Sequence, residues 1–233
     1  FKERVATSPL EDFFSDKSQI DIGLAEVLVA SLKKRNLKDA SLYHVEKLDL
    51  KLAKLINGLG PLERIYLRRL REISSDVLKA LLDDLSLERL ELGVETLSSD
   101  QAKILFTHTI KDLKLNNLRS LTAENAQYIS HFSGEKLTFD QLRSLSPKTA
   151  QGLSQFKGKL LRLNHIIHLT ADVAAELAKA QVQTIELKQL HYMDHASIQH
   201  LATFKGKSII VGNRSNWSKE QQKLFQRTPI RTY

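Results

Sequence analysis

Residues 137–160 read LTFDQLRSLSPKTAQGLSQFKGKL, and residues 161–184 read LRLNHIIHLTADVAAELAKAQVQT. Both segments begin with apolar residues two positions apart, which is the side-chain period of a strand. Further along, their apolar residues lie three and four positions apart, which is the period of a helix. Each segment is therefore predicted to form one strand followed by one helix.

The same pattern recurs along most of the chain. The first inward strand positions are Ala40, Ile65, Leu90, Leu113, Leu137, Leu161, Ile185 and Ile209, at intervals of 25, 25, 23, 24, 24, 24 and 24 residues. Such a fixed period is typical of repeat proteins, in which a single unit cannot bury its own apolar face. We therefore expect the units to stack and share one continuous core.

Polar residues at one position of each unit mark the predicted helix starts. They are Asp49, Ser74, Ser98, Thr122, Ser146, Thr170, Asp194 and Ser218, whose side-chain oxygens can accept a hydrogen bond from a first-turn amide. We interpret Gly134, Gly158 and Gly206 as helix ends in the left-handed conformation. The recurring Phe132, Phe156 and Phe204 predict an aromatic spine beneath the helix ends.

The units resemble leucine-rich repeats, particularly those of bacterial arrays with 24-residue units, and the stretch LTAENAQYISHFSGEKLTFDQL carries this resemblance. An additional apolar residue completes the pattern L-x-x-L-x-L at Leu62, Leu87, Ile110 and Val182. The chain departs from the common pattern, which has an inward Asn or Cys after the strand, at Leu70, Leu118, Leu142, Ile166 and Leu190. The resemblance implies an α/β leucine-rich-repeat solenoid with a parallel β-sheet on one face and helices on the other.

Three segments are predicted from this pattern. Residues 1–39 are expected to form a helical N-terminal cap and a lead into the array, 40–225 an array of about eight units, and 226–233 a C-terminal tail. The sequence begins at Phe1 without a methionine, so we expect that a leader or a larger N-terminal part precedes it. The compartment stays open, with the cell envelope or secretion as the hypothesis.

Composition excludes several classes of protein. Hydrophobic residues make up 42% and charged residues 27% of the chain, which argues against global disorder. The absence of cysteine excludes disulfides and thiolate catalysis. No apolar run reaches the roughly 18 residues of a membrane-spanning helix.

Outward positions of the strands, and the residues just after them, are the candidate binding residues, because alternate strand side chains point to opposite faces. They are Tyr43, Tyr66, Arg68, Arg69, Lys114, Asn116, Asn117, Asp140, Gln141, Arg162, Asn164, His165, Lys188 and Gln189. The resemblance implies that this sheet face binds partners. The leading hypothesis is a non-catalytic module for protein–protein interaction.

Two alternatives stay open. Polyanion or acidic-glycan binding could use the basic residues Arg64, Arg68, Arg69 and Arg71, or the C-terminal Arg214, Lys219, Lys223, Arg227 and Arg231. The chain could also be a scaffold domain of a larger protein. Nucleic-acid binding is disfavoured because basic and acidic residues on the predicted face nearly balance. The oligomeric state is left open.

No catalytic or cofactor motif is present. The sequence has neither a glycine-rich phosphate loop nor a nucleophile elbow, so no enzymatic activity and no cofactor are expected. His191 and His195 have the four-residue spacing of a helical metal pair. Because Asp194 stands at the predicted helix start, His191 should lie in the preceding turn, and no metal site is expected.

Overall fold

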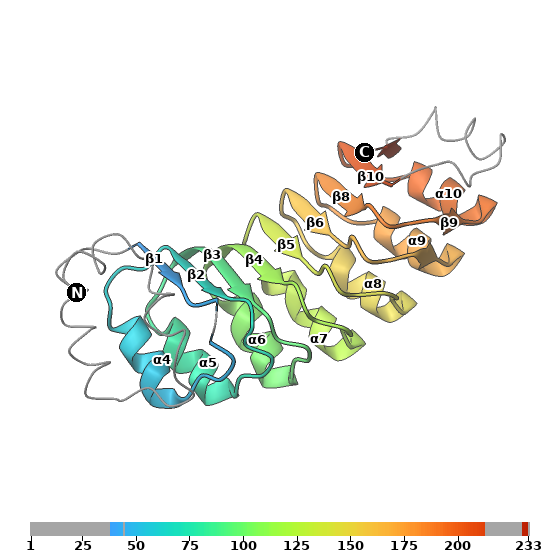
Figure 1. Cartoon of the computed structure of the whole chain (residues 1–233). Coiled ribbons are helices and arrows are strands. Elements are labelled where there is room, and N and C mark those ends of the chain that lie inside the picture. The colour runs from blue at the N-terminus through green and yellow to red at the C-terminus, as the bar shows by residue number, and fades with distance from the viewer. Residues whose placement is uncertain (1–37, 44, 213–229, 233) are drawn as a thin grey trace.

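The computed structural model describes residues 38–43, 45–212 and 230–232, and shows an elongated stack of strand–helix units (Figure 1). Its main sheet has nine parallel strands in the order β1-β2-β3-β4-β5-β6-β8-β10-β11. These strands are β1 (Asp39–Ser41), β2 (Arg64–Leu67), β3 (Leu87–Leu92), β4 (Ile110–Leu115), β5 (Lys136–Thr138), β6 (Leu160–Arg162), β8 (Thr184–Leu187), β10 (Ser208–Val211) and β11 (Ile230–Thr232). A second, two-stranded parallel sheet joins β7 (His168–Leu169) to β9 (Tyr192–Met193).

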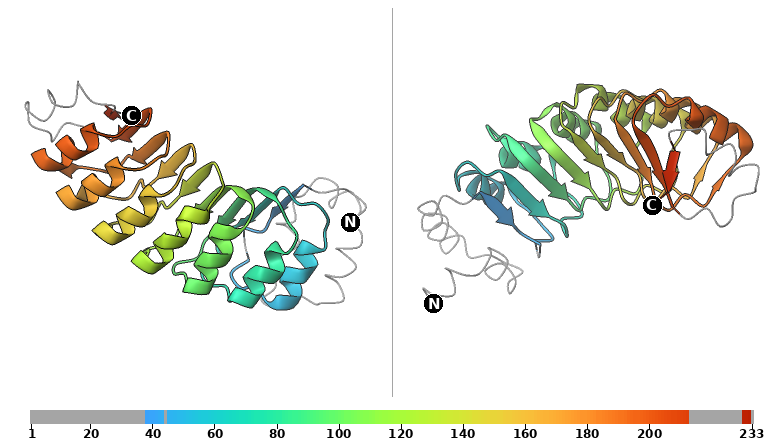
Figure 2. Two further views of the ribbon diagram at one scale, coloured as in Figure 1. Left: turned by 180° about the vertical axis from the view of Figure 1, so that it is seen from behind. Right: turned by 90° about the horizontal axis from the view of Figure 1, so that it is seen from above.

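The helices form a row on the opposite side of the main sheet, as the two further views show (Figure 2). They are α4 (Leu50–Asn57), α5 (Ser75–Leu82), α6 (Ser99–Thr107), α7 (Ala123–Gln127), the 3-10 helix η1 (Tyr128–His131), α8 (Pro147–Ser154), α9 (Ala171–Ala178) and α10 (His195–Ala202). The chain is therefore an α/β solenoid with strands on one face and helices on the other, as predicted.

Strand register confirms the equivalent positions. Ala40 pairs with Ile65, and the pairing continues in order through Leu90, Leu113, Leu137, Leu161, Ile185 and Ile209. All eight side chains are buried. The next inward position, represented by Phe139, Leu163 and Leu187, is also fully buried. One continuous apolar core thus joins neighbouring units.

Helix starts follow the predicted capping positions. Seven of them, from Asp49 to Asp194, have extended backbone and accept a hydrogen bond from the amide three residues later. Ser98 and Gln101 form a reciprocal capping box, in which each side chain bonds to the other residue's backbone. The eighth predicted position, Ser218, lies outside the described residues.

Side chains in the first helical turn take over the role of the missing asparagine ladder. Asn125 Nδ2 donates to the Leu97 carbonyl at 2.9 Å, and Thr149 Oγ1 donates to the Leu121 carbonyl at 3.1 Å. Equivalent bonds run from Gln101 to the Ile73 carbonyl and from Ser197 Oγ to the Leu169 carbonyl. Each bond spans two units and gives a backbone carbonyl a side-chain donor.

The interpretation of Gly134, Gly158 and Gly206 as left-handed helix ends is wrong. Within the described residues, Gly60 is the glycine with a positive φ, at 125°. At Gly158, an added Cβ would lie 2.1 Å from Phe156 Cζ and 2.7 Å from the Glu135 carbonyl oxygen. Glycine is needed there because a phenylalanine ring two residues earlier folds back over it.

The aromatic spine is interrupted by one unit. Ring centroids of Phe106 and Phe132 lie 6.1 Å apart, and those of Phe132 and Phe156 lie 5.7 Å apart. The equivalent position in the next unit is Ala180, so Phe204 is separated from the other rings. A groove of about 690 Å³ lies at this alanine and is lined by Ala180, Val182 and neighbouring residues.

The predictions for the N-terminal and C-terminal ends of the array have different outcomes. Residues 1–37, which hold most of the predicted helical cap, lie outside the described residues. Part of the predicted tail, 226–233, belongs to the sheet, because Ile230–Thr232 forms β11 and pairs in parallel with β10. Ile230 is buried against the core while Arg231 is exposed. This short strand covers the edge of β10.

Candidate functional site

The candidate site is the sheet face, which we define as the outward positions of the main-sheet strands β1 to β6, β8 and β10 and the two residues that follow the second inward residue of each strand. Two outward positions flank each buried inward residue, because strand side chains alternate between faces. Asp39, Arg64, Arg89 and Asp112 occupy the position before it. The candidate set omitted this position. The alternation around each inward leucine was the signal that could have included it.

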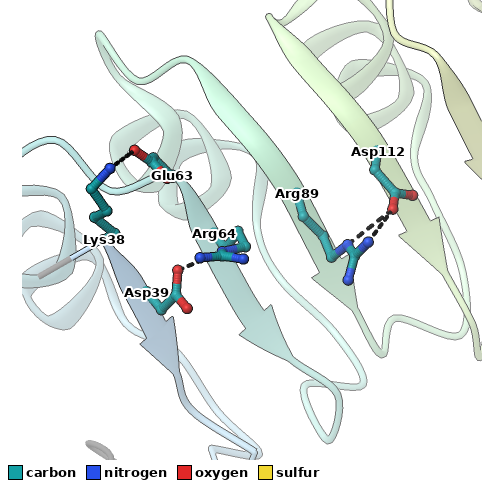
Figure 3. Close-up of polar contacts among 6 residues, drawn as sticks. All are labelled: Lys38, Asp39, Glu63, Arg64, Arg89 and Asp112. Atoms are coloured by element: carbon teal, nitrogen blue, oxygen red, sulfur yellow. Dashed lines mark hydrogen bonds and ion pairs between the residues drawn. The ribbon is translucent and has the colours of Figure 1, made fainter.

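Ion pairs join neighbouring strands at the β1–β4 end of the sheet face (Figure 3). Arg64 Nε lies 2.6 Å from Asp39 Oδ1. Both Nε and Nη2 of Arg89 lie 2.9 Å from Asp112 Oδ2. The hydrogen bond to Asp39 raises the pKa of Arg64. Similar pairs link Lys38 to Glu63 at 2.5 Å and Lys111 to Glu88 at 3.2 Å.

Glu91 organises the most connected cluster on the sheet face. It is almost fully buried and binds Arg68 through two contacts, Nε to Oε1 at 2.9 Å and Nη2 to Oε2 at 3.2 Å. Asn116 Nδ2 also donates to Glu91 Oε1, at 2.6 Å. Two neighbouring units thus hold this carboxylate from opposite sides.

Aromatic rings extend the Glu91 cluster toward β1. The Arg68 guanidinium carbon lies 4.7 Å from the centre of the Tyr43 ring, in a cation–π arrangement. The Tyr43 and Tyr66 rings are 5.8 Å apart. We call Tyr43, Tyr66, Arg68 and Glu91 the aromatic–arginine cluster. Its side chains hold one another in place.

A glycine keeps the chain close to this cluster. A Cβ on Gly93 would lie 1.9 Å from the Arg68 carbonyl oxygen, so no side chain fits at this position. The outward column is therefore empty of side chains between Arg68 and Asn116, and both residues can reach Glu91.

The central part of the sheet face, on β4 to β6, is less completely paired. Arg162 Nε binds Glu186 Oε2 at 2.7 Å, toward β8. Asp140 is half-buried, and its burial raises its pKa even though Arg162, His165 and Lys114 act in the opposite direction. A side-chain hydrogen bond with Asn164 also acts to lower the pKa of Asp140, but the effect of burial is the largest.

Contacts continue toward the C-terminal end of the sheet face. The Lys188 backbone amide donates to Asn164 Oδ1 at 3.3 Å, and the Lys188 ammonium lies 3.8 Å from Glu186. Gln189 Nε2 lies 3.3 Å from His165 Nε2. The structure thus joins Asn164, His165, Lys188 and Gln189, which are four of the candidate residues.

The structure brings some candidate residues together and separates others. Tyr43, Tyr66 and Arg68 meet at β1–β3, and Asn117 reaches the Arg68 carbonyl at 3.4 Å. Among the described residues, no hydrogen bond or ion pair joins Arg69 or Gln141 to another candidate. The binding roles of all fourteen residues stay predictions.

Acidic side chains lie beside most of the arginines in the patch that was predicted to bind polyanions. Arg64, Arg68 and Arg71 each lie beside a carboxylate, at 2.6, 2.9 and 4.0 Å. The C-terminal residues Arg214, Lys219, Lys223 and Arg227 lie outside the described residues. Within the described part, the Arg64 to Arg71 patch is largely compensated by acids.

The histidine pair and the lengths of the helices bear on metal binding and on membrane insertion. His191 precedes β9 and lies outside the helix, while His195 begins α10, as the position of Asp194 predicted. Across residues 38–43, 45–212 and 230–232, no group of three or more His, Asp or Glu side chains could hold a metal ion. None of the helices in those ranges is both long enough and apolar enough to cross a bilayer.

Comparison with known proteins identifies the class of fold. No protein-family model matches the sequence, and no curated protein matches it significantly. A solved structure of the Toll–Spätzle complex, a molecular hub in Drosophila development and innate immunity, has a TM-score of 0.53 and 19% identity to this chain. It covers 76% of this chain and 23% of the matched chain.

The glycosylated form of that complex gives a TM-score of 0.52 and 16% identity, covering 76% of this chain and 24% of the matched chain. This chain therefore spans about a quarter of the length of the chains it matches. Toll is a leucine-rich-repeat protein, and the likeness shows that this chain has a leucine-rich-repeat-like fold.

Proposed function

We propose that this chain is a non-catalytic binding module that recognises a protein through its sheet face. The observation that carries the proposal is the aromatic–arginine cluster. Tyrosine and arginine are enriched among the residues that contribute most to protein–protein binding. Here Arg68 lies over the Tyr43 ring and is fixed by two contacts to Glu91. Little conformational freedom is then lost on binding.

The solved complex gives independent support. The structures with a similar fold contain Toll together with Spätzle, so a solenoid of this general type takes part in a protein complex there. We also propose that the array is of the bacterial type with 24-residue units and occupies residues 40–225. Intervals of 23 to 25 residues between paired strand positions support this unit length.

Quantitative affinity capture with matched variants would test the proposed surface. One bait would carry Tyr43→Ala, Tyr66→Ala and Arg68→Ala. The control bait would carry Lys103→Ala, Lys148→Ala and Gln151→Ala, which are exposed residues of the helix row. Both variants need melting curves, so that loss of folding is distinguished from loss of binding.

Proteins retained by the wild-type and control baits but lost from the sheet-face bait would support the proposal. Retention of the same proteins by all three folded baits would contradict it.

A further inference from the structure

An exposed apolar patch lies on the edge of the solenoid where the chain runs from the main sheet to the following helix. Three large hydrophobic side chains are exposed among the described residues, and two of them, Ile167 at 49% and Tyr192 at 54%, lie on this edge. They belong to neighbouring units, since the His191 amide donates to the Ile167 carbonyl and His168 pairs with Tyr192. Neighbouring exposed apolar side chains on a folded domain point to a contact surface.

His168 and Tyr192 form a stack of two rings on this edge. Their ring planes are nearly parallel, at 5°, and the ring centroids lie 5.6 Å apart, which is within the range of attractive aromatic pairs. Both side chains are exposed, so the stack is open to solvent. Within the described residues, Tyr192 is the one aromatic residue whose ring contacts His168.

The preceding unit has a small residue at the equivalent position. His168 and Tyr192 each stand two residues before a helix N-cap, and Ser144 stands two residues before the N-cap of α8. Tyr192 covers the face of the His168 ring that is turned to the next unit, so the opposite face is turned to the exposed Ser144. Adjacent strands are about 4.8 Å apart, which is enough for one more stacked ring. We call the space over Ser144, beside the His168 ring, the ring slot.

An arginine and an isoleucine flank the ring slot. Arg143 directly precedes Ser144 and is exposed, and in the described part of the chain no ion pair engages it. By contrast, Arg119 at the equivalent position of the preceding unit lies 3.2 Å from Glu95. A carboxylate is therefore the group that complements Arg143. Ile167 holds the same position in the next unit and offers an apolar contact.

Charge on this edge favours a protein over a nucleic acid. A nucleic acid needs several unpaired cations along its phosphates. Arg71 and Arg119, which hold the position of Arg143 in earlier units, both lie within 4.0 Å of Glu95. One arginine without an acid suits a single carboxylate, which an aspartate or glutamate side chain provides.

We propose that this edge binds a protein segment in which an aromatic residue stands next to an acidic one. The aromatic side chain enters the ring slot and stacks on His168, its rim contacts Ile167, and the carboxylate pairs with Arg143. These residues lie outside the sheet face, so the inference goes beyond the proposed function and does not depend on it. One stacked ring and one exposed ion pair give weak binding, which calls for peptide probes at millimolar concentration.

Nuclear magnetic resonance titration of the labelled full chain measures this binding. The probe is the peptide acetyl-Gly-Trp-Glu-Gly-amide, which should shift the amide signals of Ser144, Ile167, His168 and Tyr192. Replacing the tryptophan of the peptide by leucine removes the stacking and should weaken binding by about two- to tenfold. Replacing its glutamate by lysine should weaken binding by about two- to fivefold, because the ion pair with Arg143 is lost.

Two pairs of protein variants test the ring slot. Ser144→Phe fills the slot with a ring of the chain itself and should abolish binding of the tryptophan peptide. Ser120→Phe places the same ring at the equivalent exposed position one unit earlier, so binding should persist. His168→Ala removes the stacking surface and should weaken binding, whereas His131→Ala, at an exposed histidine of η1, should not. Melting curves of all four variants show whether each is folded.

Several results would overturn the proposal. One is a titration in which the tryptophan peptide shifts none of these signals at millimolar concentration, or binds no more tightly than the leucine peptide. Another is unchanged binding by folded Ser144→Phe or folded His168→Ala. A hexathymidylate oligonucleotide that binds the same signals more tightly than the tryptophan peptide would assign the edge to a nucleic acid and would also overturn it.

Discussion

Carboxylates on the sheet face have different surroundings in β1–β3 and in β4–β6. At the first end, Asp39 and Glu91 are matched by arginines of a neighbouring strand. In the centre, no ion pair within 4.0 Å engages Asp140 among the described residues, and its Oδ1 is buried without a hydrogen-bond donor. Ion pairs thus fix the sheet face in the first region, whereas the second region is less completely paired. A stacked array permits this because each unit contacts mainly its neighbours.

Removing Glu91 should have the largest effect on stability. Glu91→Ala takes the acceptor from both Arg68 and Asn116 and should lower the free energy of unfolding by about 2 kcal/mol. The loss stays below the roughly 3–5 kcal/mol of a fully buried broken pair, because Arg68 is half exposed and can be hydrated. Urea unfolding followed by circular dichroism measures it.

Arg71→Ala is the control for the Glu91 variant. Arg71 is 78% exposed and lies 4.0 Å from Glu95, so its loss should change stability by less than about 0.5 kcal/mol. Equal effects of the two substitutions would show that the pairs at this end do not fix the surface.

Thr149→Val measures, in the same protein, how much stability is lost when a buried acceptor has no hydrogen-bond donor. It removes the bond from Thr149 Oγ1 to the buried Leu121 carbonyl and should lower the free energy of unfolding by about 1–2 kcal/mol. Thr149→Ser keeps the hydroxyl and should recover most of this loss. A Thr149→Val protein as stable as the wild type would mean that such atoms are readily satisfied by water, which would weaken the contrast between the two regions.

Asp140→Asn should act in the opposite direction and more weakly. The free energy of unfolding at neutral pH should rise by about 0.5 kcal/mol, since Asp140 is only half-buried and partly hydrated. Chemical unfolding of the two proteins in the same buffer gives the difference. A decrease in the free energy of unfolding would show that Asp140 makes stabilising contacts, as the ion-paired carboxylates of β1–β3 do.

The pH dependence of that difference should be the smallest effect. Burial raises the pKa of Asp140 in the folded protein above that of the unfolded chain. The folded state therefore binds the proton more tightly, and stability falls as pH rises from the ordinary Asp pKa through the raised value. The advantage of Asp140→Asn should shrink on acidification through this window. A difference that grows on acidification would reverse the assigned direction of the pKa shift.

Sequence alone predicted the parts of the fold that each unit repeats. Side-chain period predicts the inward positions around Leu137 and Leu161. Hydrogen-bonding capacity predicts the capping residues. The role of Gly158 could not, because it depends on the Phe156 ring folding back in space. β11 was missed because three residues are too few to carry the repeat signal.

The candidate site was predicted less completely. The outward positions after each inward residue were recognised, and Tyr43, Tyr66 and Arg68 do lie together. Arg89 and Asp112 were missed, although strand alternation places them on the same face. Which acids and bases pair, and which atoms stay without partners, depends on rotamers that a single sequence does not specify.

Hydrogen exchange of the full chain, with and without the captured partner, tests the central claim most directly. We expect the partner to slow exchange in β4, β5 and β6 and in the residues that follow them, around Asn116, Asp140 and Asn164. Exchange in the exposed turns of α7, α8 and α9 should stay the same. Protection confined to those helices, with the strands unchanged, would contradict the claim that this protein binds through its sheet.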